Sequence, residues 1–381
     1  MNTRKIKQTI LFAFAFSILC LGNSIAFADT KTGGFSNATG SSQQAVVVKN
    51  LNQLEQAFNS NQHHIIISGS IYGGNKPITF TFSDKKWDNT TIEGQAGTNP
   101  TLTNIQLKFD GEMLPENQTI SNITVKNITF NGVISDLQQL KGNDIIPGGS
   151  GVNYEGVSLR RINNVWIDHN DFHDMSDDLF SISLQSDNVT VSNNHFWFSN
   201  QWLNMNPNPN WNWIGDWHDL ATERLTMVVG ANGSDSYIQG GHKLHVTLHD
   251  NWFGPNLKGR PLLRGYVHAY NNYFDNSNQP TGNNSAGFSQ QQYNALQIGS
   301  GSYVLSENNF FYKTNNSHLI GLDKNGDSYK FLERNNIYNQ VTGINATSNA
   351  NSSDFNFPYQ YSTLSSDNIK QQVINNAGPF K

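Results

Sequence analysis

The neighbouring side chains of Asp168 and His169 could do chemistry together. A carboxylate beside an imidazole can move protons, so the pair is a candidate for general acid–base catalysis. Other histidines, such as His245 and His249, occupy alternating strand positions and do not form a metal-ligand cluster. Cys20 is the only cysteine. The sequence therefore predicts no disulfide, and no thiol chemistry once the N-terminal segment is removed.

A tryptophan-rich insertion at 198–220 is a second candidate for function. Trp202, Trp211, Trp213 and Trp217 lie there among asparagine and proline residues. Aromatic faces on a polar loop suit the packing of sugar rings. A loop that folds on its own tryptophans would show the same composition, and the sequence leaves both interpretations open.

A recurring segment must position these side chains. Each copy alternates apolar and polar residues, turns at an asparagine and restarts with an aromatic residue, which indicates a strand, a turn and a second strand. Asparagine suits the turn because it tolerates a left-handed backbone. The copies are at 123–130, 165–172, 189–196, 246–253, 267–274, 304–310 and, more weakly, 335–337.

The spacing of the copies predicts an all-β fold of stacked rungs, that is, a β-solenoid. The copies ending at 172 and 196 are 24 residues apart, a period typical of one solenoid rung. An antiparallel sandwich would not place the same asparagine at the same phase of six segments. Stacked rungs would pair asparagine amides at the turns and fill the interior with apolar ladders.

The open end of such a solenoid needs a cap, and the helical spacing of Leu51, Leu54, Ala57 and Phe58 predicts a short N-terminal capping helix. We expect a signal peptide at 1–28, a flexible segment at 29–47 and a single β-helix domain at 48–381. The irregular segment after residue 338 is expected to pack along the outside of this domain.

The N-terminus has the order of a secretory signal peptide. Arg4, Lys5 and Lys7 precede a short apolar run, and Ala26-Phe27-Ala28 forms a small-x-small cleavage site. A lipoprotein anchor at Cys20 is the alternative, disfavoured by the bulky Leu19. No later stretch is long and apolar enough to span a membrane. We therefore expect a secreted protein.

Charge limits the partners of the exported chain. Without the signal peptide, 21 basic residues face 29 acidic ones, a net charge of about −8. This balance argues against general nucleic-acid binding. An acidic polymer could bind only where positive charge or a cation is concentrated.

Several motifs, in a fixed order between residues 48 and 340, resemble the family 1 polysaccharide lyases, the pectate and pectin lyases. They are Val165-Trp166-Ile167-Asp168-His169, Ile65-Ile66-Ile67-Ser68-Gly69-Ser70-Ile71, Thr91-Ile92-Glu93-Gly94, and Arg260-Pro261-Leu262-Leu263-Arg264 followed by Val267-His268-Ala269-Tyr270-Asn271-Asn272. The resemblance implies a right-handed parallel β-helix, which agrees with the solenoid predicted from the repeat. It also implies β-elimination across a 4-linked galacturonate, and it makes the segment of Asp168 and His169 scaffolding rather than a catalytic pair.

The resemblance implies a calcium site, because calcium binds oxygen ligands and can share them with a uronate. The calcium acids of the family fall at Asn153, Glu155, Asp177 and Ser181 of this sequence. Glu155 and Asp177 are ligands of the right type, whereas Asn153 is neutral and Ser181 replaces an acid. Asp178 is adjacent and could compensate. Fewer charges predict weak calcium binding.

The catalytic base implied by the resemblance is an arginine in the pattern R-x-P-x-x-R. Here Arg260 directly precedes Pro261, and Gly259 takes the position two before the proline. With a one-residue gap, Arg260 is the base and Arg264 binds the substrate acid. Without gaps, Lys258 falls at the base position, and a lysine could do related work because its pKa shifts readily.

A further substrate lysine of the family falls at Leu225, with Arg224 adjacent as the remaining cation. The resulting prediction is a secreted, monomeric pectate lyase that uses calcium to degrade demethylated pectin, an acidic polysaccharide. One alternative is a pectin lyase that acts on methylated substrate without calcium. The other is a carbohydrate-binding β-helix protein that has lost catalytic activity, to which Ser181, Leu225 and the shifted arginine point.

Overall fold

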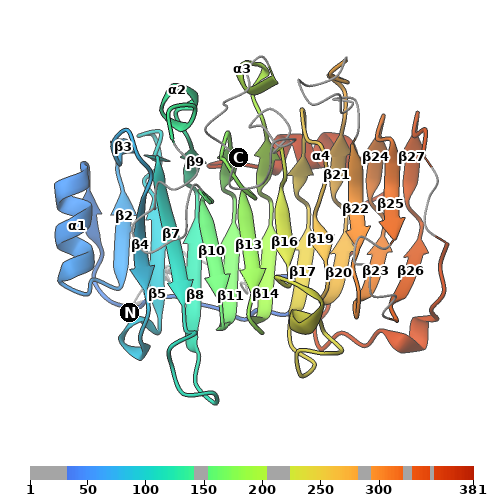
Figure 1. The fold of residues 1–381 in the computed structure, drawn as a ribbon, viewed down its shortest axis with the longest axis horizontal. Coiled ribbons are helices and arrows are strands. Elements are labelled where there is room, and N and C mark those ends of the chain that lie inside the picture. The colour runs from blue at the N-terminus through green and yellow to red at the C-terminus, as the bar shows by residue number, and fades with distance from the viewer. Residues whose placement is uncertain (1–31, 141–152, 204–223, 282–292, 321–327, 344–346) are drawn as a thin grey trace, which may run out of the picture. The chain divides into compact units, whose positions relative to one another are not determined.

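The computed structural model describes residues 32–140, 153–203, 224–281, 293–320, 328–343 and 347–381. Residues 31–381 form one compact unit. Its strands pair in parallel and stack rung upon rung in three sheets (Figure 1). The β-solenoid predicted from the repeat is therefore confirmed.

We label the ten-stranded sheet A, the nine-stranded sheet B and the eight-stranded sheet C. Sheet A contains β1 (Val46–Val48), β2 (His64–Ile67), β5 (Thr90–Gly94), β8 (Ile120–Lys126), β11 (Ile162–Asp168), β14 (Asp187–Ser192), β17 (His245–His249), β20 (Tyr266–Tyr270), β23 (Tyr303–Glu307) and β26 (Lys330–Arg334). Sheet B contains β3 (Ser70–Tyr72), β6 (Thr101–Thr103), β9 (Thr129–Asn131), β12 (Asp171–His173), β15 (His195–Trp197), β18 (Trp252–Phe253), β21 (Tyr273–Asp275), β24 (Phe310–Tyr312) and β27 (Ile337–Asn339). Sheet C contains β4 (Ile78–Phe82), β7 (Ile105–Asp110), β10 (Val157–Arg160), β13 (Phe180–Ser183), β16 (Met227–Val229), β19 (Leu262–Leu263), β22 (Asn294–Ile298) and β25 (Asn316–Ile320).

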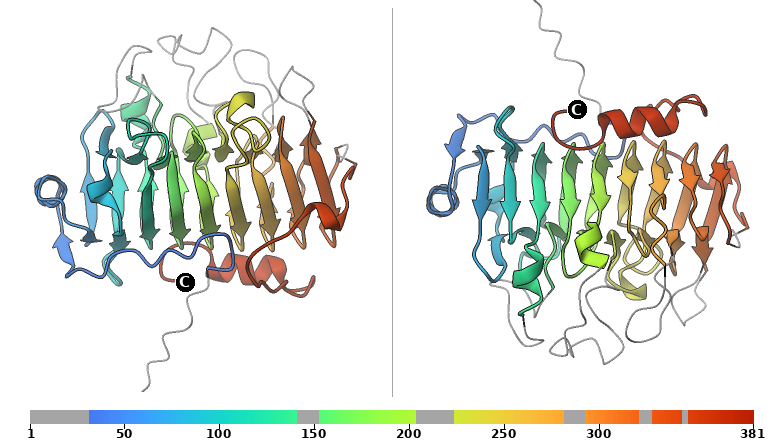
Figure 2. Two further views of the ribbon diagram at one scale, coloured as in Figure 1. Left: turned by 90° about the horizontal axis from the view of Figure 1, so that it is seen from below. Right: turned by 90° about the horizontal axis from the view of Figure 1, so that it is seen from above.

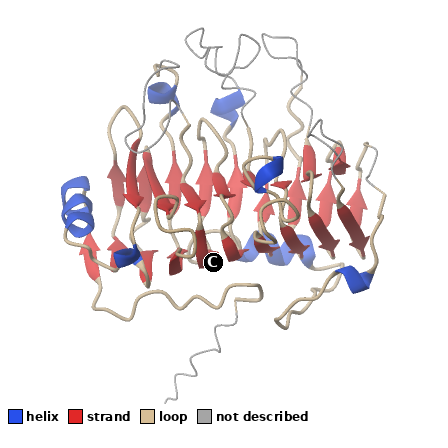
Figure 3. Ribbon diagram, turned by 60° about the horizontal axis from the view of Figure 1, so that its bottom comes forward, coloured by secondary structure: helices blue, strands red, loops and turns tan. Residues whose placement is uncertain are grey.

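The interior is filled by ladders of identical or similar side chains. In sheet B, the ring of Phe196 stacks on Phe172 at 5.1 Å and on Phe253 at 5.2 Å, with interplanar angles of 6° and 9°. The parallel register brings the same position of each rung into contact, so alternation along the strand becomes a continuous apolar core across the rungs. In the described part of the chain, the helices lie outside the stack of strands (Figure 3).

The turn from sheet A to sheet B explains the recurring asparagine. Its first residue takes a left-handed backbone, with φ of 52° at Asn193 and 55° at Asn271. Its second residue points inward and joins a buried amide ladder, in which Asn194 Nδ2 donates to Asn251 Oδ1 at 3.1 Å. The ladder runs through Asn170, Asn194, Asn251, Asn272, Asn309 and Asn336.

Helix α1 (Leu51–Asn59) covers the first rung, as the spacing of its apolar residues predicts. It begins at Asn50, whose side chain accepts a hydrogen bond from the backbone of Gln53 and so satisfies one of the free N–H groups of the first turn. Leu54 and Ala57 are buried against the rung. The other helical elements are α2 (Ile134–Leu137), α3 (Asn200–Leu203), α4 (Ile369–Asn376) and the 3-10 turns η1 (Lys85–Trp87), η4 (Gly233–Asp235) and η5 (Ser352–Asp354).

The N-terminal segment differs from the flexible tail expected at 29–47. From residue 32 it lies along the outside of sheet A (Figure 2). The backbone of Ser36 donates to Thr190 Oγ1 at 2.9 Å, and that of Asn37 to Asn164 Oδ1 at 2.8 Å. At Gly40 (φ 67°), a Cβ atom would lie only 2.0 Å from Thr91 Oγ1. The ladder of threonine and asparagine side chains on sheet A thus binds the segment.

The C-terminal segment packs along the outside of the β-helix, and it is more ordered than the sequence indicated. The ring of Phe357 stacks on His268 at 4.2 Å, and the hydroxyl of Tyr359 lies 2.9 Å from Thr247 Oγ1. Helix α4 then buries Ile369 and Val373 in a small cluster with Tyr273 of sheet B. The sequence did not predict this helix.

Two sequence predictions fall wholly or largely outside the described residues. These are the signal peptide at 1–28, which includes Cys20, and most of the tryptophan-rich insertion. Trp202, at the described start of the insertion, is buried and packs on Phe198 at 5.0 Å, as in a loop that folds on its own tryptophans. None of the helices in the described part of the chain has the length and hydropathy of a membrane span.

Candidate active site

The candidate residues gather on the outer face of sheet C, where its central strands begin. Ser158 of β10 pairs with Ser181 of β13, which pairs with Val228 of β16. An isolated parallel bridge joins Leu225 to Gly259, three residues before this row. Because the rungs are in register, segments that are far apart in sequence place the side chains before these strands next to one another.

Carboxylates lie just before β10 and β13: Glu155 precedes β10, and Asp177 and Asp178 precede β13. Ser181 Oγ donates to Glu155 Oε2 at 2.6 Å and lies 2.8 Å from Ser158 Oγ. Burial, followed by the negative charge of Asp177, raises the pKa of Glu155 to about 8. Asp178 adds a further negative charge that acts in the same direction. The three acids thus create a negative potential that a cation would relieve.

The donor set fits a hard cation in type. Glu155, Asp177 and Ser181 supply only oxygen atoms, which calcium prefers. Asn153 Oδ1 is buried without a hydrogen-bond partner, as is typical of an oxygen atom that awaits a ligand. Within the described residues, however, no three histidine, cysteine, aspartate or glutamate side chains converge closely enough to hold a metal ion. Substrate oxygen atoms and water would have to complete the coordination shell.

Arg260 faces the acids from the segment just before β19, which follows β10, β13 and β16 in sheet C. Its backbone takes the left-handed conformation (φ 72°), immediately before Pro261. Its guanidinium forms an ion pair with the buried carboxylate of Asp178, and 23% of its side chain stays exposed. The structure therefore brings Arg260, Asp177, Asp178 and Glu155 together on one face.

Positions 225 and 259 lie side by side on neighbouring rungs, and neither carries a charge. The family resemblance implies a lysine at position 225, and position 259 lies two before Pro261, where the R-x-P-x-x-R pattern has an arginine. A Cβ atom added at Gly259 would lie 2.8 Å from Gln297 Nε2, the far end of a flexible side chain. A larger residue at this position therefore requires the Gln297 side chain to move, and Arg260 occupies the adjacent position.

The remaining predicted cations differ in exposure. Arg224 is fully buried, and its Nη1 donates to the carbonyl of Asn256 at 3.1 Å. Arg264 is 6% exposed, and its Nη1 donates to the carbonyl of Gly230 at 2.7 Å. Both guanidinium groups therefore bind the scaffold in this conformation, which does not favour their predicted contact with substrate. Lys258 is half-buried, and its backbone N–H donates to the carbonyl of Arg224.

Two pairs of residues remain: Asp168 with His169, which lies away from the acids, and Ser158 with Ser181, which lies among them. Asp168 and His169 form a 2.7 Å hydrogen bond on sheet A, and Ser192 Oγ donates to Asp168 at 2.6 Å, so the pair lies on a different sheet from the acids. The sequence interpretation missed the role of Ser158 and Ser181, which contact each other and solvate Glu155. Both residues precede the recurring segments, so the repeat did not reveal that they pair across β10 and β13.

Known proteins are similar to this chain in sequence. The family model for pectate lyase matches residues 219–381. A pectate trisaccharide-lyase of Bacillus licheniformis is 26% identical over 387 residues, which cover 97% of this chain and 92% of that protein. A pectate lyase of Bacillus subtilis is 28% identical over 321 residues, which cover 77% of this chain and 64% of that protein.

Solved structures show the same fold. A pectate lyase from a Bacillus species, crystallised in complex with trigalacturonate, superimposes with a TM-score of 0.60 at 21% identity and covers 91% of this chain and 98% of that chain. Pectate lyase II from Xanthomonas campestris gives a TM-score of 0.60 at 17% identity, with 91% and 97% covered. Family model, relatives and fold together support the assignment of this chain to the pectate lyase family, the family 1 polysaccharide lyases.

Proposed function

We propose that this protein is a secreted pectate lyase that cleaves 4-linked polygalacturonate by calcium-assisted β-elimination. The observation that carries the proposal is the meeting, on one face of sheet C, of the acids Glu155, Asp177 and Asp178 with the guanidinium of Arg260. The pectate lyase activities of the Bacillus relatives support it. Secretion is inferred from the signal peptide that the sequence predicts at residues 1–28.

The reaction makes three demands on the site. The C5 carboxylate of the uronate must be neutralised, the C5 proton must be removed, and the negative charge that develops must be stabilised. Calcium, held by Glu155 and Asp177 with neutral oxygen atoms from Asn153 and Ser181, would neutralise that carboxylate. The hydrogen bond from Ser181 holds Glu155 in place on this face.

Arg260 is the proposed base, and its ion pair with Asp178 must break before it can act. The carboxylate of Asp178 stabilises the protonated guanidinium, which cannot accept the C5 proton. Arg260 must therefore leave Asp178 and lose its proton before it accepts one from C5. Lys258 is the alternative base, since a lysine deprotonates more readily than an arginine.

A second candidate function is supported by specific positions. Gly259 and Leu225 offer no charged side chain where the family resemblance implies two cations, and Ser181 stands in the place of an acid. A β-helix with these residues could bind an acidic glycan without cleaving it. The test of the proposal must therefore separate binding from turnover.

The test is an ultraviolet assay of the purified protein with polygalacturonate, first with calcium and then with excess chelator. Cleavage by β-elimination creates an unsaturated uronide that absorbs ultraviolet light, whereas binding does not. The proposal predicts a calcium-dependent rise in absorbance. Turnover of methylated pectin in the presence of chelator would instead indicate a pectin lyase. Folded protein that binds polygalacturonate without any rise in absorbance would establish the binding protein.

A further inference from the structure

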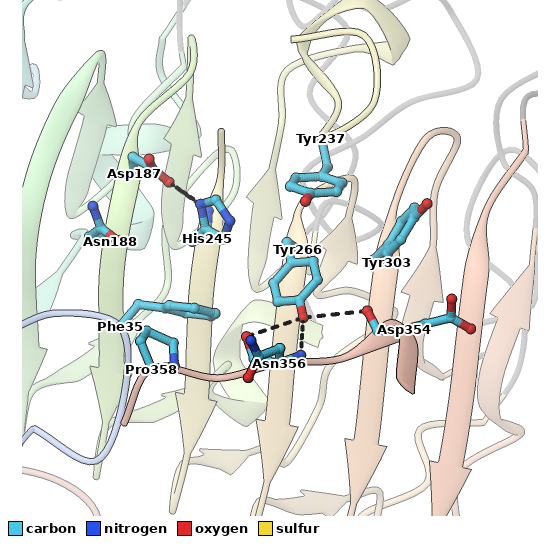
Figure 4. Close-up of a pocket in the computed structure, with 10 residues that line it drawn as sticks. All are labelled: Phe35, Asp187, Asn188, Tyr237, His245, Tyr266, Tyr303, Asp354, Asn356 and Pro358. Carbon is cyan, nitrogen blue, oxygen red and sulfur yellow. Dashed lines mark hydrogen bonds and ion pairs between the residues drawn. The ribbon is translucent and has the colours of Figure 1, made fainter. Parts of the chain in front are cut away.

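A hollow of about 480 Å³ lies on the outer face of sheet A, away from the candidate active site (Figure 4). It is lined by the first residues of several sheet A strands, by the loop before β17 and by both terminal segments. Phe35 comes from the N-terminal segment, and Asn356 and Pro358 come from the C-terminal one. The two segments that cover sheet A therefore leave a depression between them.

Aromatic side chains repeat along this hollow with the period of the rungs. His245, Tyr266 and Tyr303 begin three successive strands and pair directly across the sheet. Their ring centroids are 5.3 and 6.1 Å apart. Neighbouring strands lie about 4.8 Å apart, so the β-helix itself sets the spacing of these rings.

Tyr237 adds a ring from outside the sheet. It lies in the loop before β17, and its backbone N–H donates to the carbonyl of Arg264 at 2.7 Å. Its ring centroid is 5.2 Å from that of Tyr266 and 5.1 Å from that of Tyr303. Tyr266 is buried, and its hydroxyl accepts a hydrogen bond from the backbone of Asn356 at 2.6 Å. The rings are thus held in place by the scaffold.

The polar groups of the hollow are balanced in charge. Asp187 Oδ1 lies 2.7 Å from His245 Nδ1, and Asp187 Oδ2 lies 3.4 Å from Lys243 Nζ. Asp354 forms an ion pair with Lys330, whose Nζ lies 5.0 Å above the ring of Tyr303. Each carboxylate thus has a lysine partner, and the described lining offers no surplus positive charge to a uronate.

We propose that this hollow is a carbohydrate-binding site for a neutral pyranose unit of a polysaccharide. Aromatic rings pack against the C–H faces of a sugar ring, and the amides and carboxylates around them can bind its hydroxyl groups. The volume is within the range of ligand sites, about 300–1,000 Å³. The site lies on sheet A, whereas the acids lie on sheet C, so it does not depend on the lyase reaction.

The experiment is isothermal titration calorimetry of the full protein with two neutral probes, β-1,4-galactotetraose and cellotetraose, and with trigalacturonate. The proposal predicts binding of at least one neutral probe. Tyr237→Ala should weaken that binding about tenfold, because it removes a stacking ring. Tyr237→Phe retains the ring and should stay within a few-fold of the parent protein.

The matched control is Tyr72→Ala, which removes an exposed tyrosine from β3 of sheet B. It should leave the affinity for the neutral probe unchanged, and thermal unfolding checks that each variant is folded. The proposal is overturned if neither neutral probe binds at millimolar concentration, or if Tyr237→Ala leaves the affinity unchanged. Equal losses for trigalacturonate and the neutral probe in Tyr237→Ala would also overturn it, since the hollow would then be a site for acidic sugars.

Discussion

The turn between sheets A and B and the outer face of sheet C are built from the same rungs but follow different rules. At the second position of the turn, successive rungs carry asparagine, and each side-chain amide donates a hydrogen bond to the next. On sheet C, the equivalent positions carry Glu155, Asp178, Leu225 and Gly259, which differ in charge and size. Identical neighbours therefore stabilise the stack, while unlike neighbours create a site for chemistry.

The largest effect is expected in the phenylalanine ladder. Phe196→Ala removes a fully buried ring that stacks on both sides, and should lower the free energy of unfolding by about 4 kcal/mol. Thermal and urea unfolding measure the loss. Phe380→Ala, at a ring that is 42% exposed, is the control and should change stability by less than about 0.5 kcal/mol. If Phe196→Ala changes stability as little as the control, stacked identical residues do not stabilise the fold.

A somewhat smaller loss is expected in the asparagine ladder. Asn194 Nδ2 donates to the carbonyls of Ile167 and Ser192 and to Asn251 Oδ1. Asn194→Ala would leave these buried groups without a partner and should cost about 3 kcal/mol in the free energy of unfolding. Urea unfolding measures it against Asn52→Ala, a change at an exposed position of α1. A loss below about 1 kcal/mol would show that water replaces the amide.

Calcium binding at the carboxylate face, that is, at Glu155, Asp177 and Asp178 on sheet C, should depend on pH. The asparagine ladder at the turn has no group that titrates in this range. Glu155 has a raised pKa of about 8, so it is protonated below that pH and must lose its proton when a cation binds. Calcium affinity, measured by calorimetry, should therefore rise up to about tenfold per pH unit between pH 6 and 8, and level off above.

Glu155→Gln should weaken calcium binding and remove this pH dependence, because glutamine carries no exchangeable acid proton. Glu116→Gln, at an exposed position of the loop before β8, is the matched control. Calcium affinity in the parent protein that does not change between pH 6 and 8 would contradict the assignment of Glu155 as a ligand.

The smallest expected effect is a gain. Gly259→Arg combined with Leu225→Lys restores the two cations that the family resemblance implies, and Gln297 can move to make room. We expect a several-fold rise in kcat/KM on polygalacturonate. Leu225→Met, which keeps position 225 apolar, is the control. A fall in activity in a folded double variant would mean that the added cations interfere with Arg260, which then acts as the base without them.

The regular half of this comparison could be predicted from the sequence, because the repeat encodes it directly. The alternation of residues 189–196 gave strand, turn and strand, and α1 followed from its apolar spacing. Helix α4 was missed because its polar-rich sequence forms a helix by packing Ile369 and Val373 on sheet B. Contacts of this kind between distant segments leave no periodic signal.

The site could be predicted only in part. The positions of Glu155 and Asp177 followed from the register of the family motif, whereas the ion pair of Arg260 with Asp178 depends on the left-handed backbone before Pro261. Ser181 was interpreted as a lost acid, yet it donates to Glu155. Burial of Arg224 and Arg264 depends on how later rungs cover them, which spacing does not encode.

The measurement that tests the central claim most directly compares kcat/KM on polygalacturonate, with calcium, for Arg260→Ala and Lys258→Ala. Asp178→Asn/Arg260→Ala provides a second variant in which no buried charge loses its partner. With Arg260 as the base, both Arg260 variants should lose at least about 100-fold, while Lys258→Ala should lose less than about tenfold. Full activity in the folded Arg260 variants would contradict the assignment of the carboxylate face and Arg260 as the active site.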